Sequence, residues 1–147
     1  MMPYERFHAW KACDDLAVAV YRVSAAFPRH ELYGLTSQSR RAAFSAAANI
    51  AEGSAKRGPR EFRRYLDIAV GSLSGLSYAL RLSWRLEYLS TEQWRELDKL
   101  RSDASRLTWL LYRAIGRASQ GSDHPSALTA ALPTAASSTA LTAAVAV

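Results

Sequence analysis

The chain has 147 residues, 49% of them hydrophobic, which fits one domain with a sizeable core. Its 19 Lys and Arg residues outnumber 13 Asp and Glu residues, and the net charge of +6 permits binding to nucleic acid or another anionic surface without requiring it. The single cysteine, Cys13, excludes an intramolecular disulfide and fits a reducing compartment.

Neither a secretory signal nor a membrane span is expected. Glu5, Arg6, His8 and Lys11 interrupt the N-terminus, where the core of a signal peptide would be apolar. Outside the Ala/Thr-rich end, no stretch has the roughly 20 uncharged apolar residues of a membrane helix. We therefore expect a cytoplasmic protein.

Apolar residues at helical spacing predict a first helix from about Tyr4 to Ala26, which Pro28 ends. They form two neighbouring stripes, and one stripe is enough for an ordinary amphipathic helix. Two stripes indicate contact with several helices or with another subunit. One comprises Phe7, Trp10, Ala17, Val20, Tyr21, Ser24 and Phe27, and the other Ala9, Ala12, Leu16, Ala19, Val23 and Ala26.

The stretch from Gly34 to Gly53 predicts a thin second helix at the centre of the fold. It is rich in Ala and Ser, which lets neighbouring backbones approach closely, and Phe44 and Ile50 are its only large apolar residues after the first turn. Thr36 or Ser37 is predicted to cap the N-terminus of this helix. Gly53 is predicted to end it in the left-handed conformation.

Four polar residues on this central helix predict a structural network, because buried polar groups need partners. They are Arg40, Arg41, Asn49 and Glu52. We favour Glu52 as a partner of Arg40, Arg41 or the backbone amides of the following turn. The alternative is a catalytic carboxylate beside Asn49.

A third helix is predicted from Pro59 to about Leu86, with Pro59 in its first turn. Gly71 and Gly75 thin its middle at a cost of roughly 1 kcal/mol each relative to Ala, so we expect close packing there against the second helix. Its predicted buried stripe comprises Phe62, Tyr65, Leu66, Ala69, Leu73, Leu76, Leu80 and Trp84.

A fourth helix is predicted to run to about Ala118. Ser90 and Gln93 have the spacing of a capping box at its start, and Thr91 is the alternative cap. Its apolar arc is broad. One predicted line comprises Trp94, Leu97, Arg101, Ala104, Thr108, Leu111 and Ile115, and a second Leu100, Leu107, Leu110 and Ala114.

These elements predict an all-α protein, an antiparallel up-down-up-down four-helix bundle over residues 1–119. Residues 120–147 contain no Lys or Arg and are predicted to form a low-complexity, mobile tail. The alternative for this segment is a short helix from about Thr134, packed on a neighbouring subunit.

The sequence offers no catalytic or metal-binding motif. His8, His30 and His124 lie in different elements, and the Glu5–His8 spacing occurs once, whereas di-iron bundles need a repeated Glu-x-x-His motif. Cys13 is interpreted as a small core residue. No serine elbow or phosphate-binding glycine loop is present, so we expect neither a cofactor nor an enzyme.

The strongest functional pattern is a basic cluster, defined as Lys56, Arg57, Arg60, Arg63 and Arg64, with Glu61 as the only acid among them. Basic residues at a helix N-terminus oppose the helix dipole, so local stability does not explain them. Arginine can bind phosphate groups in bidentate fashion. The cluster predicts a nucleic-acid site, and the alternative is a solvated face paired with nearby acids such as Asp67.

Several short motifs in and around the central helix occur together. They are Gly34-Leu35-Thr36-Ser37-Gln38, Arg40-Arg41-Ala42 and Ala48-Asn49-Ile50-Ala51-Glu52-Gly53, with Phe27-Pro28 before them and Ala69-Val70-Gly71-Ser72-Leu73 after them. In these motifs the chain resembles the four-helix-bundle proteins encoded in 23S rRNA intervening sequences. The resemblance extends from about Phe7 to Ile115, and Ser39, Ser45-Ala46 and Gly75 depart from the family pattern.

The resemblance implies a bacterial cytoplasmic protein that assembles as a ring-like homopentamer. A related protein is the accessory variability determinant of diversity-generating retroelements, a basic pentamer that associates with reverse transcriptase and nucleic acid. For most of the family no activity is established.

We therefore expect a non-enzymatic, oligomeric bundle that binds RNA or DNA through the basic cluster. The first alternative is a protein-interaction scaffold whose basic surface meets an acidic partner. The second is an enzyme with a site at Asn49 and Glu52.

Overall fold

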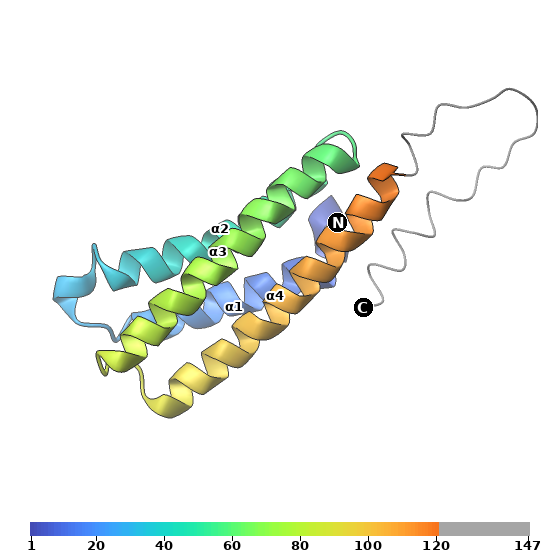
Figure 1. Ribbon diagram of the computed structural model, residues 1–147. Coiled ribbons are helices and arrows are strands. Elements are labelled where there is room, and N and C mark those ends of the chain that lie inside the picture. Colours follow the sequence, from blue (N-terminus) through green and yellow to red (C-terminus); the bar gives the residue numbers. More distant parts are fainter. Residues whose placement is uncertain (121–147) are drawn as a thin grey trace, which may run out of the picture.

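The computed structural model describes residues 1–120, which form a bundle of four helices without a strand (Figure 1). Two single-turn 3-10 helices accompany the bundle. The elements are η1 (Pro3–Arg6), α1 (His8–Ser24), η2 (Arg29–Glu31), α2 (Leu35–Ser54), α3 (Pro59–Arg85) and α4 (Thr91–Gln120). The all-helical prediction and the bundle are confirmed for this part of the chain, and the predicted tail lies outside it from residue 121 on.

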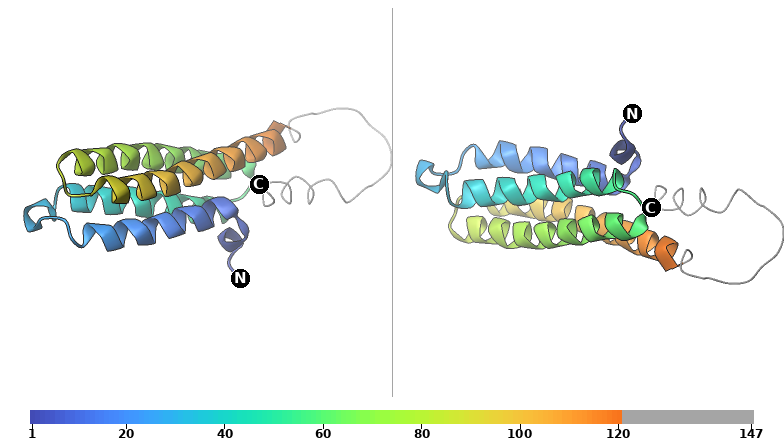
Figure 2. Two further views of the ribbon diagram at one scale, coloured as in Figure 1. Left: turned by 90° about the horizontal axis from the view of Figure 1, so that it is seen from below. Right: turned by 90° about the horizontal axis from the view of Figure 1, so that it is seen from above.

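Each helix packs against two others, so the four surround one core. The most extensive contact joins α2 and α3, and α1 packs against both α2 and α4. Short connections join consecutive helices from α1 to α4 (Figure 2). None of the helices within residues 1–120 is long and apolar enough to cross a membrane.

The first helix differs from the prediction at both ends. Phe7 adopts an extended conformation with φ −93° and ψ 122°, which separates η1 from α1. This break places the Phe7 ring in the core, with its centroid 5.5 Å from that of Phe62 on α3. The buried line of α1 runs between the two predicted stripes, and Tyr21 is exposed. It comprises Ala9, Cys13, Leu16, Val20 and Ser24.

The thin second helix packs in the core as predicted. Ala43, Ala46 and Ile50 have no exposed surface. The hydroxyl oxygens of Ser45 on α2 and Ser72 on α3 lie 2.8 Å apart, a distance that only short side chains permit between neighbouring helices. Phe44 is the exception, because 64% of its surface is exposed.

The predicted caps of α2 are wrong at both ends. The helix begins at Leu35, whose backbone N–H donates to Glu31 Oε2 at 2.7 Å, while Thr36 is buried. The Glu31 carboxylate therefore caps the N-terminus of α2 in place of Thr36 or Ser37. A Cβ at Gly34 would lie 2.6 Å from Glu31 Oε2, so glycine leaves room for this cap.

Gly53 lies inside α2 and does not end it in the left-handed conformation. The helix continues to Ser54, and its C-cap residue Ala55 has φ −90°. A Cβ at Gly53 would lie 2.7 Å from Tyr65 Cβ and 2.8 Å from Phe62 Cδ2 on α3. Glycine is thus required there by helix contact. The left-handed residue of this connection is Gly58, with φ +83°, directly before Pro59 in the first turn of α3.

The predicted close packing at Gly71 and Gly75 is also wrong within the protomer. Both residues are exposed, and a Cβ added at either would meet no atom within 4 Å. Ser72, not its glycine neighbours, faces α2. The contact between the two helices therefore depends on the glycine of α2.

The predicted capping box of α4 is confirmed. The Gln93 N–H donates to Ser90 Oγ at 3.1 Å, and the Ser90 N–H donates to Gln93 Oε1 at 2.9 Å. The first predicted apolar line of α4 supplies its core residues, whereas Leu100 of the second line is exposed. The buried members are Leu97, Ala104, Thr108, Leu111 and Ile115.

Cys13 is a core residue, as predicted. It is fully buried, and its sulfur lies 3.7 Å from Thr108 Oγ1 on α4. Thr108 also donates to the Ala104 carbonyl at 2.8 Å. Burial raises the pKa of the Cys13 thiol from 9.0 to about 11, which the hydrogen bond to Thr108 partly opposes.

The substitution Gly53→Ala should destabilise the bundle. Its methyl group would overlap Phe62 and Tyr65, and overpacking of this kind costs about 1–3 kcal/mol. The gain in helix propensity, about 1 kcal/mol, offsets part of this cost. Urea unfolding followed by circular dichroism measures the difference, and unchanged or higher stability would show that α3 moves away from α2 at no cost.

Ionisation of Cys13 should lower the free energy of unfolding of the bundle above pH 9. The folded state keeps the thiol protonated to about pH 11, whereas the unfolded chain ionises it from pH 9.0. The contribution of the protonated thiol to the free energy of unfolding is therefore fully present below pH 9.0 and is lost as the pH rises towards 11. Relative to Cys13→Ala, the wild type should lose about 2–3 kcal/mol over this range in urea titrations. If the difference in stability between the wild type and Cys13→Ala does not change with pH, the thiol ionises equally in the folded and unfolded states.

Candidate nucleic-acid interface

The basic cluster occupies the α2–α3 connection and the first two turns of α3. Lys56 pairs with Glu52 at 3.7 Å, and Arg64 pairs with Glu61 at 3.5 Å. These side chains are substantially exposed, so the ion pairs contribute little stability. Arg57 and Arg60 are exposed and have no ion-pair partner among residues 1–120.

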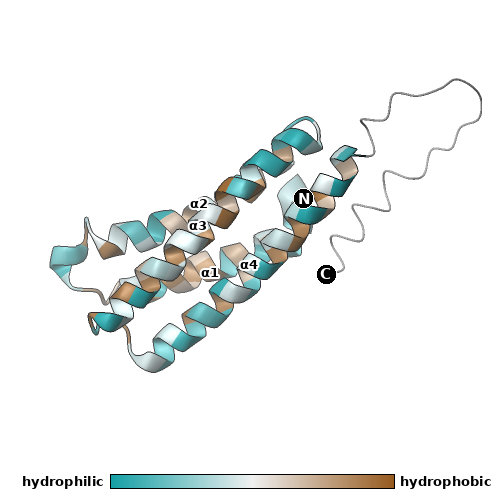
Figure 3. Ribbon diagram, viewed as in Figure 1, coloured by the Kyte–Doolittle hydropathy of each residue, from teal (hydrophilic) through white to brown (hydrophobic). Residues whose placement is uncertain are grey.

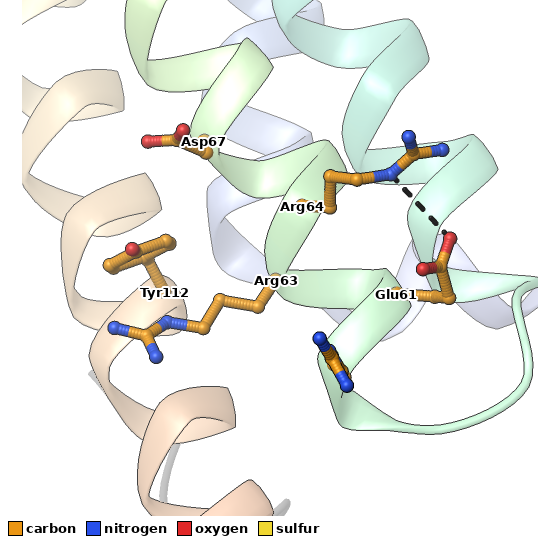
Figure 4. A pocket seen from close by; sticks show the side chains of 6 residues that line it. Glu61, Arg63, Arg64, Asp67 and Tyr112 are labelled. Atoms are coloured by element: carbon orange, nitrogen blue, oxygen red, sulfur yellow. Dashed lines mark ion pairs between the residues drawn. The ribbon is translucent and has the colours of Figure 1, made fainter.

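Arg63 is set apart from the rest of the cluster because it reaches across to α4. Its guanidinium carbon lies 4.4 Å from the centroid of the Tyr112 ring (Figure 4). A Cβ at Gly116 would lie 3.2 Å from the same group, so this glycine gives the arginine its space. Arg63 Nε is buried without a hydrogen-bond partner, and the cation–π contact with Tyr112 offsets part of that cost.

A shallow depression of about 420 Å³ lies beside these residues, between α3 and α4. Its wall carries three guanidinium groups and two carboxylates, which leaves a small positive excess. Arg63 and Tyr112 point towards each other there, while Arg64 turns away to Glu61 (Figure 4). The lining residues are Arg60, Glu61, Arg63, Arg64, Asp67 and Tyr112.

The contribution of α4 was missed by the sequence interpretation. Tyr112 stacks on Trp109 with ring centroids 5.3 Å apart and planes at 14°. Arg113 and Arg117 are exposed on the last turns of α4, where Gly116 lies against Arg63. Residues 104–120 contain three Arg and no Asp or Glu, and this bias was the signal available in the sequence.

The four polar residues predicted as one network occupy separate settings. Arg40 donates to Ser24 Oγ at 2.8 Å and to the Tyr21 carbonyl at 3.3 Å, near the end of α1. Arg41 is exposed. Asn49 donates to the carbonyl and hydroxyl oxygens of Ser45 at 2.8 and 3.0 Å.

Glu52 is exposed and pairs with Lys56, not with Arg40 or Arg41. Twelve residues separate Arg40 from Glu52, which is about 18 Å along a helix, so one helix cannot bring their side chains together. The predicted network is therefore wrong in the protomer. Arg40, Asn49 and Glu52 each make a separate local contact, and Arg41 is exposed.

No metal centre is formed within the part of the chain that the structure describes. No three His, Cys, Asp or Glu side chains gather there as potential ligands. His8 is exposed as the first residue of α1, and His30 lies at the opposite end of the bundle, 3.3 Å from the Tyr88 hydroxyl. His124 lies outside the described residues.

Comparisons with known proteins agree on the family. Residues 5–109 match the family described as 23S rRNA-intervening sequence protein. None of the curated proteins compared with the chain matches it. The relation to the accessory variability determinant rests on the sequence resemblance alone.

A solved structure shows the same fold: a protein of unknown function from the S23 ribosomal protein family of Bacteroides thetaiotaomicron VPI-5482. It is 21% identical, with a TM-score of 0.66, and the similarity covers 71% of this chain and 97% of that one. The match over residues 5–109, which is most of the chain, shows that this protein belongs to the 23S rRNA-intervening sequence protein family.

Proposed function

We propose that this protein is a non-enzymatic helical bundle of the cytoplasm that binds RNA or DNA through the basic cluster. The observation that carries this proposal is the joint setting of Arg60, Arg63 and Arg64 around one surface depression. Surface cations that neutralise phosphates release counterions, which favours binding. The helix dipole disfavours these cations at the start of α3, so a ligand accounts for them better than local stability does.

The charges in this region are available to an anionic ligand. Arg57 and Arg60 have no carboxylate partner in residues 1–120, and the Glu61–Arg64 pair is exposed enough to exchange. Arg113 and Arg117 extend the positive surface onto α4. The surface around the start of α3 therefore offers more positive charge than the six residues of the depression alone.

We further propose that up-down-up-down bundles assemble as a homo-oligomer, with a pentamer expected from the family resemblance. α3 supports this, because several apolar and small residues along it are exposed, among the hydrophobic and hydrophilic segments that alternate on this helix (Figure 3). These exposed residues are Ile68, Gly71, Gly75 and Tyr78, with Phe44 exposed on the neighbouring α2. Glycines with open space above them allow another helix to approach closely.

Binding should depend steeply on salt and on the exposed arginines of the cluster. If about five phosphates are neutralised, a plot of log affinity against log salt should have a slope near −4 to −5. Arg57→Gln, Arg60→Gln and Arg64→Gln together should reduce its magnitude by about 3. Filter binding with RNA and DNA across a salt series measures both effects.

The matched control for this triple variant changes Arg81, Arg85 and Arg95, which are exposed at the other end of the bundle. It removes the same charge and should leave the slope nearly unchanged. No binding at low salt, or equal effects of the two triple variants, would refute the proposed site. Capture of an acidic protein after nuclease treatment, with no affinity for RNA or DNA, would favour the scaffold hypothesis instead.

Assembly should fail when bulky residues replace the exposed glycines of α3. In the double variant Gly71→Leu and Gly75→Leu, neither new Cβ lies within 4 Å of another atom of the protomer. Each substitution also improves helix propensity by roughly 1 kcal/mol. The protomer should therefore stay folded while light scattering reports a loss of the oligomer. Ser102→Leu, at an exposed position of α4, should leave the wild-type mass. A monomeric wild type would contradict the proposal.

A further inference from the structure

The exposed tryptophan of α4 stands beside the basic cluster without a role in the core. Half of the Trp109 surface is exposed. The other three tryptophans are partly buried: Trp84 and Trp94 stack on each other, and Trp10 packs near Tyr4. Trp109 is thus the tryptophan that offers a large aromatic surface to a ligand.

Trp109 is also held in a fixed orientation. One of its faces stacks on Tyr112, with the planes at 14°, and the Arg63 guanidinium lies 4.4 Å from the Tyr112 ring centroid. Tyr112 therefore contacts both the Arg63 guanidinium of α3 and the Trp109 ring of α4. No cation–π contact within residues 1–120 involves the indole of Trp109.

The surroundings of Trp109 carry the charge that a nucleic-acid strand requires. Arg106 and Arg113 lie three residues before and four residues after it, on neighbouring positions of the helix surface. Arg60 and Arg63 line the depression that Tyr112 shares, where Glu61 and Asp67 are the acids. An aromatic ring between phosphate-binding side chains is the arrangement that stacks unpaired bases, because every base has a flat face.

We propose that Trp109 is a stacking platform for an unpaired base, so the preferred ligand is a single-stranded nucleic acid. A duplex cannot use the platform, since its bases are already stacked within the helix. The inference rests on the proposed function and adds that the bound nucleic acid is single-stranded.

The test measures the affinity of the full chain for three probes of equal length, about 16 nucleotides: oligouridylate, an abasic strand and a duplex. Trp109→Ala should weaken binding of oligouridylate by roughly 5- to 100-fold and leave binding of the other two probes unchanged. Trp109→Phe, which keeps a ring, should recover most of the affinity. Tyr33→Ala removes an aromatic residue that is 93% exposed at the opposite end of the bundle, and it should change nothing.

Tryptophan fluorescence supplies a second readout that does not depend on affinity. Oligouridylate should quench the wild type and leave the emission of Trp109→Phe unchanged, because the stacked fluorophore is gone. Circular dichroism shows whether each variant stays folded. The stacking proposal is refuted if oligouridylate binds all variants with equal affinity. It is also refuted if Trp109→Ala weakens binding of the abasic strand as much as binding of oligouridylate. In both cases the proposed electrostatic binding stands. If no probe binds at low salt, the proposed function itself fails.

Discussion

The close contact between α2 and α3 is the constraint on which the rest of the structure depends. At Gly53 there is no room for a side chain, because Phe62 and Tyr65 of α3 occupy the space where Cβ would lie. Farther along, Ser45 and Ser72 meet through their hydroxyl groups at 2.8 Å. These contacts fix where α3 begins relative to α2, and the basic cluster sits at that beginning.

This arrangement also explains why the arginines of the cluster lie in different environments. Phe62 turns into the core against Phe7, so the next residue, Arg63, projects towards α4. Arg60 and Arg64 stay on the solvent side of α3. One helical turn thus supplies both surface charges for phosphates and an inward guanidinium that supports Tyr112 and Trp109.

The polar residues of α2 show how a central helix can carry such groups without a shared network. Arg40 binds oxygen atoms of Tyr21 and Ser24 near the end of α1, where unpaired carbonyls and the helix dipole favour a cation. Asn49 returns to Ser45 of its own helix, and Glu52 reaches solvent beside Lys56. Each of these three groups is satisfied locally, while Ala43 and Ala46 of the same helix belong to the hydrophobic core.

The sequence by itself determined the four helices, most of the buried stripe of α3, the capping box of α4 and the family. Periodicity, Pro59 and the Ser90–Gln93 pair are local signals, and local signals suffice for these features. Only the tertiary structure decided which glycine lies between helices, because the sequence does not show what faces Gly53, Gly71 or Gly75. The same holds for Trp109 and Tyr112: helical spacing predicts neither the contact of Tyr112 with Arg63 nor the exposure of Trp109, since both depend on where α4 meets α3.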